Sequence, residues 1–114
     1  MDITAIEGQE LTAVEFIGDH LRLYFDGPRF TLYDWPTVLL SDFSVAFGEP
    51  EYRNALCAHM GQLVEKAVLE DEESLTIELE NGTVFGLSLH GEDLDGPVVG
   101  SFSESGSDAD EQEF

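Results

Sequence analysis

Residues 20–33 read HLRLYFDGPRFTLY, and residues 74–88 read SLTIELENGTVFGLS. In both stretches, large apolar residues alternate with other residues on either side of a glycine that follows Asp or Asn. Alternation with a period of two is typical of a strand with one face in the core, and Asp-Gly or Asn-Gly between two such runs predicts a β-hairpin. Each stretch therefore predicts two antiparallel strands joined by a tight turn, with Leu21, Leu23 and Phe25 in the core.

The two hairpins belong to a longer internal repeat. Residues 8–9 (Gly-Gln) recur at 61–62 with an offset of 53, and residues 30–32 (Phe-x-Leu) recur at 85–87 with an offset of 55. One-residue insertions in turns would produce this drift. A further alternating run precedes each hairpin, so each copy predicts three strands; these runs cover residues 12–17 and 64–70.

The segment between the two copies carries helical signals. Pro50 suits a first helical position, Leu56 and Met60 lie four residues apart, and Gly61 suits the position after a helix. We therefore predict a helix from Pro50 to Met60. Residues 35–47 are apolar but aperiodic, and we expect them to continue the third strand and then form a loop.

Together these elements predict an α+β fold. It consists of two repeated three-stranded antiparallel β-meanders joined by a segment containing one helix, which form either a curled sheet or a small barrel-like sandwich. We expect a single domain, residues 1–99, that consists of repeat one (8–35), the helical connection (36–60) and repeat two (61–90). Residues 100–114 hold five acidic residues and no basic one, and we expect them to form a flexible acidic tail. Residues 98–102 could add a short edge strand.

The charge balance of the chain excludes several classes of partner. The 114 residues include 25 Asp or Glu but only 4 Lys or Arg, which gives a net charge of −21. Proteins that bind a phosphate backbone or an anionic membrane surface need basic residues, so we expect neither direct nucleic-acid binding nor membrane binding. A basic protein is the partner that the charge favours. A single cysteine (Cys57) and the lack of a signal or spanning segment favour a cytoplasmic location.

The chain shows no catalytic signature, and we expect no catalytic residue, metal or cofactor. Cys57 and His59 are two residues apart, so on a helix they would not share a face. The predicted loop at residues 90–97 contains His90 and several acids, but its spacing fails the EF-hand pattern. A solvated acidic loop is the better interpretation.

The outward side of the first repeat differs from that of the second. It carries Arg22, Tyr24 and Tyr33, with Trp35 just beyond, where the second repeat has small or acidic residues. Because Tyr, Trp and Arg dominate binding hot spots, these four residues are candidates for contact with a partner. The alternative is that the predicted helix packs on this face and buries it.

The last five residues supply a second candidate for partner binding: Asp110, Glu111, Gln112, Glu113 and Phe114. This ending resembles the C-terminal tips of bacterial and phage single-stranded-DNA-binding proteins. The resemblance implies a docking tail whose terminal Phe enters an apolar pocket on another protein. An ordinary solvating tail is the alternative.

The body of the chain resembles small uncharacterised bacterial proteins, some of them immunity proteins. The matching residues are Gly8-Gln9, Val14, Asp26-Gly27, residues 52–57, Gly61-Gln62 and Asn81-Gly82. The resemblance implies the duplicated fold and an immunity-type function, and it transfers no catalytic residue.

Three functional hypotheses follow. The first is a non-enzymatic acidic protein that inhibits or neutralises a basic partner, as an immunity protein or a nucleic-acid mimic would. The second is a protein whose acidity is an adaptation to a salt-rich cell. The third is a small ligand-binding or enzymatic domain that uses the aromatic face of the first repeat.

Overall fold

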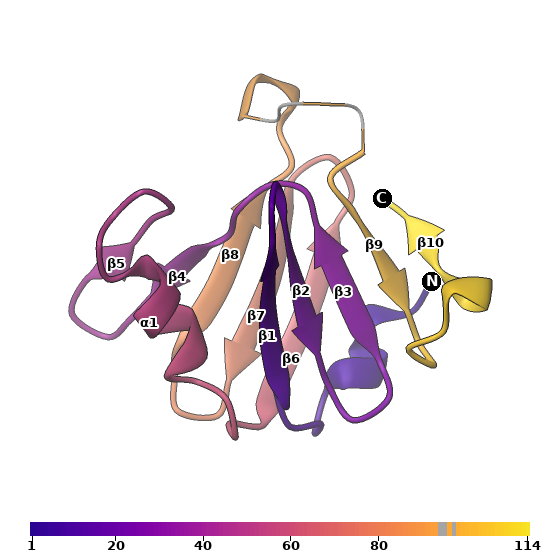
Figure 1. Ribbon diagram of the computed structural model, residues 1–114, viewed down its shortest axis with the longest axis horizontal. Helices are drawn as coiled ribbons and strands as arrows, with labels where there is room; N and C mark the ends of the chain where they lie inside the picture. Colours follow the sequence, from indigo (N-terminus) through magenta and orange to yellow (C-terminus); the bar gives the residue numbers. More distant parts are fainter. Residues whose placement is uncertain (94–95, 97) are drawn as a thin grey trace.

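The computed structural model describes residues 1–93, 96 and 98–114, and it is mostly β (Figure 1). Its described residues form ten strands in two antiparallel sheets, with one α-helix, and the sheets do not close into a barrel. In order across the first sheet the strands are β1 (Ala13–Ile17), β2 (His20–Tyr24), β3 (Arg29–Leu32), β9 (Gly100–Ser103) and β10 (Gln112–Glu113). In order across the second they are β5 (Ser44–Val45), β4 (Thr37–Leu39), β8 (Val84–Ser88), β7 (Ser74–Leu79) and β6 (Val64–Glu70).

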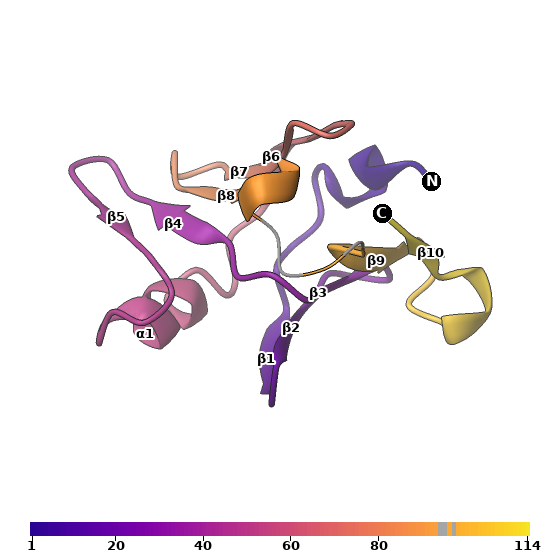
Figure 2. The ribbon, with the colours of Figure 1, turned by 90° about the horizontal axis from the view of Figure 1, so that it is seen from above.

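Four short helical segments complete the described part of the chain. They are the α-helix α1 (Tyr52–Cys57) and the 3-10 helices η1 (Ile3–Ile6), η2 (Gly91–Asp93) and η3 (Asp108–Asp110). None of the described helices is long and apolar enough to cross a bilayer. Figure 2 shows α1 beside β4 and β5 at one end of the molecule, with β9 and β10 toward the opposite end.

The core lies where the inward faces of the two sheets meet. In the first sheet Leu21 and Leu23 of β2 are fully buried and pair with Leu32 and Phe30 of β3. In the second, Leu75, Ile77 and Leu79 alternate with half-buried residues along β7. Side chains alternate between the faces of a strand, so β2, β7 and β8 bury every second residue, whereas β3 and β9 bury all four of theirs. Strands therefore form at all six predicted positions, and the predicted core residues Leu21, Leu23 and Phe25 are buried.

The helix and the strand before it differ from the sequence-based expectation. The helix is shorter than the predicted Pro50–Met60, because no side chain caps its start at Glu51 and the chain turns at His59 and Met60. The aperiodic stretch 35–47 forms β4 and β5, which extend the second sheet beyond β8. β4 takes that place because its backbone pairs with β8, with Val38 buried opposite Phe85.

The C-terminal segment differs most from expectation. Residues 100–114, predicted to be a flexible tail, form β9, η3 and β10, and β9 pairs with β3 on one side and with β10 on the other. Phe102 accounts for part of this, because it is buried with its ring centroid 4.6 Å from that of Phe30. The predicted loop at 90–97 lies partly on residues 94, 95 and 97, outside the described residues.

A symmetric set of backbone hydrogen bonds joins the segments that precede β1 and β6. Glu10 and Leu63 form an antiparallel bridge between them. The bonds run from Gly8 N to Val64 O (2.8 Å), from Gly61 N to Leu11 O (2.8 Å), from Leu11 N to Gln62 O (2.9 Å) and from Val64 N to Gln9 O (2.9 Å). Exchanging each residue for the one 53 positions away converts the first bond into the second and the third into the fourth.

We predict that Gly100→Ala destabilises the protein by about 1–3 kcal/mol. A Cβ at this position would lie 2.3 Å from the backbone oxygen of Thr31, so β9 would have to move away from β3. Urea denaturation measures the free energy of unfolding. Gly91→Ala is the matched control, because a Cβ there meets nothing within 4 Å. Equal stability of the two variants would contradict the close pairing of β9 with β3.

Candidate functional site

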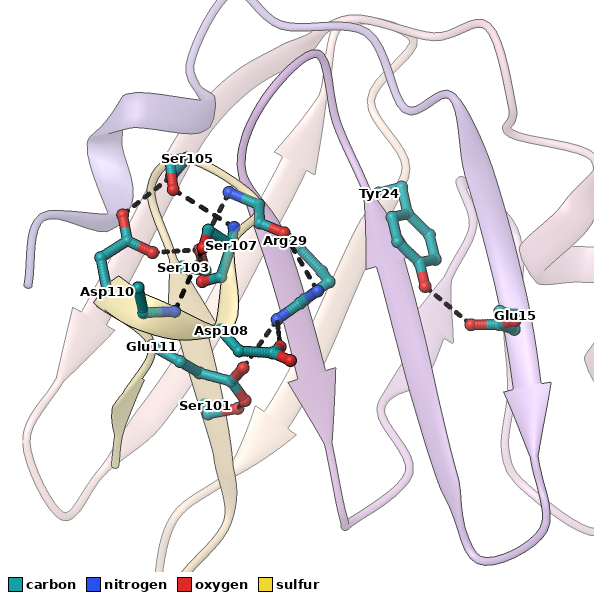
Figure 3. A network of polar contacts seen from close by, with 12 residues as sticks. Glu15, Tyr24, Arg29, Ser101, Ser103, Ser105, Ser107, Asp108, Asp110 and Glu111 are labelled. Carbon is teal, nitrogen blue, oxygen red and sulfur yellow. Dashed lines mark hydrogen bonds and ion pairs between the residues drawn. The ribbon is translucent and has the colours of Figure 1, made fainter.

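A buried arginine on the outward face of the first sheet holds the C-terminal segment (Figure 3). Arg29 of β3 is only 9% exposed. Its Nη2 lies 2.7 Å from a carboxylate oxygen of Asp108 and 2.6 Å from one of Glu111, and its Nη1 donates to the carbonyl of Gly106 at 3.1 Å. A guanidinium presents several donors in a fixed plane, so one side chain can bind three acceptors from one segment. We call this set of contacts the Arg29 latch.

Two serines of β9 extend the Arg29 latch. The hydroxyl of Ser101 donates to Glu111, and the hydroxyl of Ser103 contacts the carboxylate of Asp110. The Ser103 oxygen also accepts a bond from the amide of Gly106 at 2.9 Å. Both serines are buried although they lie on the outward face of the sheet, because the C-terminal segment covers them.

The Arg29 latch lowers the pKa of two carboxyl groups. The hydrogen bond from Arg29 holds the pKa of Asp108 below its ordinary value of 3.8. The hydrogen bond from Ser103 does the same for the pKa of Asp110. Each bond favours the ionised carboxylate over the protonated group.

The terminal Phe114 docks on the chain itself. Its amide donates to the carbonyl of Gly100 at 3.0 Å, its carbonyl accepts from the amide of Val99 at 2.8 Å, and its ring packs edge-on against Phe30 at 6.1 Å. Glu113 lies opposite Ser101 and is exposed. The C-terminal residues, whose sequence suggests either a docking tail or a solvated one, therefore bind the chain's own sheet in this structure.

The predicted aromatic face separates into two places. Arg22, Tyr24 and Tyr33 lie on the outward side of the first sheet, where Tyr24 Oη donates to Glu15 at 2.7 Å and Tyr33 is 41% exposed. The helix does not bury this side. Trp35 instead lies near α1, with its ring centroid 6.3 Å from that of Tyr52.

Trp35 is the centre of a stack of three rings. The Phe16 ring lies 6.1 Å from it at an interplanar angle of 14°, and the Phe47 ring lies 4.4 Å from it at 11°. The guanidinium carbon of Arg53 lies 4.9 Å from the centroid of the Phe16 ring, within the range of a cation–π contact. Tyr52 stands perpendicular to Phe47 and donates its hydroxyl to the carbonyl of Pro36; burial raises its pKa. Sequence reasoning missed Phe47, because residues 35–47 show no periodicity.

Two hollows border Phe47. The first, of about 300 Å³, is lined by Asp34, Trp35, Thr37, Phe47, Gly86, Leu87 and Ser88. The second, of about 290 Å³, is lined by Phe47, Gly48, Glu49, Pro50, Tyr52 and Arg53. The exposed Phe47 ring is therefore a wall shared by both hollows.

A third hollow, of about 440 Å³, lies between the β6–β7 turn and η2, and three of its six lining residues are glutamates. His90 Nε2 lies 3.1 Å from a carboxylate oxygen of Glu73 there. Within the described ranges, no group of three or more His, Cys, Asp or Glu residues is placed to hold a metal ion. Asp95, part of the predicted acidic loop, lies outside those ranges.

The comparisons with known proteins give no functional lead. No family model matches the chain, and no curated protein or solved structure matches it.

We predict that Arg29→Gln loosens the C-terminal segment and lowers the free energy of unfolding by about 1–3 kcal/mol. The substitution leaves Asp108 and Glu111 without their cation, although both carboxylates can regain water. Urea denaturation and limited proteolysis after residue 103 measure the two effects. Lys66→Gln is the control, because this substitution removes the same charge from an exposed residue of β6. Equal protease resistance of both variants would contradict the Arg29 latch.

We predict that Asp108 and Asp110 titrate below 3.8 in the folded protein. Because their folded-state pKa values are lowered, their contribution to docking is present above about pH 4 and is lost as the pH falls through the lowered values. NMR titration of the carboxyl carbons measures the midpoints. In Arg29→Gln the Asp108 midpoint should rise toward 3.8. Wild-type midpoints at or above 3.8 would show that the segment is undocked.

Proposed function

We propose that the chain is a non-enzymatic binding protein that engages a basic protein, as a stoichiometric inhibitor or an immunity-type partner would. One observation carries the proposal. Of the acidic residues whose burial is described, all except Asp34, Glu78 and Glu111 are exposed, whereas Arg29, one of only four basic residues, is buried. The surface therefore presents many carboxylates and very few cations.

Such a surface favours fast association with a cationic protein. Charges of one sign over a surface attract an oppositely charged partner and raise the association rate, and salt weakens this effect. The same field repels nucleic acids, so the target would be a basic protein, including one that itself binds nucleic acid. A cytoplasmic location is part of the proposal, supported by the single free cysteine.

We further propose that the two meanders, β1–β3 and β6–β8, are copies of one unit. Support comes from the exchange symmetry of the four backbone bonds between residues 8–11 and 61–64. The glycines that the sequence repeat aligns also share a backbone conformation: φ is positive at Gly8 and Gly61, and again at Gly27 and Gly82. In a symmetric dimer the same residues of both subunits meet, so each contact recurs with the two subunits exchanged. The four backbone bonds recur in this way, which fits two copies of one unit fused in a single chain.

Salt adaptation is the second candidate. The wide distribution of exposed acids over both sheets and the single lysine favour it. A ligand site on the outward face of the first sheet is a third candidate, supported by the exposed Tyr33. The described hollows do not include Tyr24 or Tyr33, so this third candidate has less support.

We expect the immobilised protein to retain a basic protein from a cell lysate at near-physiological salt, and the pair to elute from size exclusion as a stoichiometric complex. Electrostatic attraction predicts that retention weakens as salt rises, because the screening length falls from about 10 Å at 0.1 M to about 3 Å at 1 M. Failure to retain any basic protein would contradict the proposal.

The melting temperature in KCl separates this proposal from salt adaptation. If the acids serve a partner, KCl screens their mutual repulsion and the melting temperature levels off above roughly 0.1–0.3 M salt. Salt adaptation predicts a rise that continues to molar KCl.

A further inference from the structure

We propose that the hollow lined by Trp35 and Phe47 receives an arginine side chain of the basic partner, with its guanidinium stacked on the exposed part of the Phe47 ring. This inference rests on the proposed function and specifies where on the surface, and through which group, the partner is held. Three features of the described residues support it: the open end of the ring stack, the carboxylates around it, and the apolar side chains beside it.

The ring stack already binds one cation. Arg53 lies over Phe16 at one end, Trp35 is the middle ring, and Phe47 is the other end. Phe47 remains 55% exposed, so a large part of its ring is accessible to a partner. An aromatic face attracts a cation through its quadrupole, and a planar guanidinium can stack on it as well. The accessible part of Phe47 therefore offers a partner the type of contact that Arg53 makes within the chain.

The charges around the hollow favour a cation. Asp34 is buried, lines the hollow and already has a partner within the chain, so the exposed carboxylate beside Phe47 is that of Glu49, which lines the adjoining hollow together with Phe47. A carboxylate close to an aromatic ring gives a guanidinium both an ion pair and a stacking surface. Arg53, the one cation that lines either hollow, is already in contact with Phe16.

Apolar side chains lie beside the exposed Phe47 ring. Leu87 lines the hollow, and Leu39 of β4, which is 43% exposed, has its Cδ1 3.6 Å from the position of a Cβ on Gly86, which lines the hollow as well. Three exposed acids lie between β4 and α1: Asp42, Glu49 and Glu51. Apolar anchors surrounded by charge are typical of protein-binding surfaces. The acidic surroundings select a basic partner over a second copy of this chain, which would bring an equal negative charge.

The test uses the full chain and a short peptide of alternating arginine and glycine. Trp35 is the only tryptophan, so its fluorescence reports directly on the hollow. We expect the peptide to change this fluorescence in a saturable way. Calorimetry should show binding that Phe47→Ala weakens roughly three- to tenfold, the loss expected for a partly desolvated cation–π contact.

Two controls match the variants that affect the hollow. Phe43→Ala removes an exposed phenylalanine that lines neither hollow, and it should change the affinity less than twofold. Glu49→Gln should weaken binding more than Glu65→Gln, which removes the same charge from the exposed side of β6 at the far edge of the second sheet. Phe47, Phe43 and both glutamates are exposed, so all four variants should fold.

The outcomes separate this inference from the proposed function. Equal affinities for Phe47→Ala and Phe43→Ala would overturn the arginine site while leaving an acidic protein that binds basic partners. Equal binding of a lysine–glycine peptide would overturn guanidinium stacking. If neither peptide bound and no basic protein were retained, the proposed function would fail together with the site.

Discussion

The structure depends on one buried guanidinium. Arg29 lies on β3, the central strand of the first sheet, and it binds Asp108 and Glu111 of a segment that would otherwise repel the body of the protein. The C-terminal fifteen residues hold five acids and no base, so chain entropy and charge both oppose their docking. The Arg29 latch offsets that repulsion, while Phe102 and Phe114 add apolar contact with Phe30. Without the latch, η3 and β10 would lose the cation that holds them against the first sheet.

Internal use of the few cations shapes the surface. Arg29 is bound by the chain's own carboxylates, and Arg53 is held over Phe16. The remaining acids are left to face solvent with little neutralisation. The Arg29 latch and the ring stack lie toward opposite ends of the molecule, with α1 at one end and β10 at the other (Figures 1 and 2). One end is therefore closed by the chain's own tail, and the other keeps an exposed aromatic surface.

Periodicity alone predicts the strands β1–β3 and β6–β8, because alternation of apolar residues follows directly from burying one face of a strand. Periodicity fails at Trp35. Alternation places Tyr33 and Trp35 on the same face of a strand, but the chain leaves the sheet before Pro36, so the two rings lie in different environments. It also fails for β4 and β5, which are short and lack alternation. The acidic composition of residues 100–114 wrongly predicts a solvated tail. Acidic residues stay in solvent unless a buried cation binds them, and nothing in the sequence pattern marks Arg29 as buried.

Amide hydrogen exchange of the intact protein tests the central claim most directly. The amide of Phe114 donates to Gly100 O, and that of Val99 donates to Phe114 O. If the C-terminal segment is a strand of the first sheet, both amides exchange far more slowly than unstructured backbone. Exchange at the rate of a free chain at these two positions, with the amides of β2 and β3 still protected, would contradict the account.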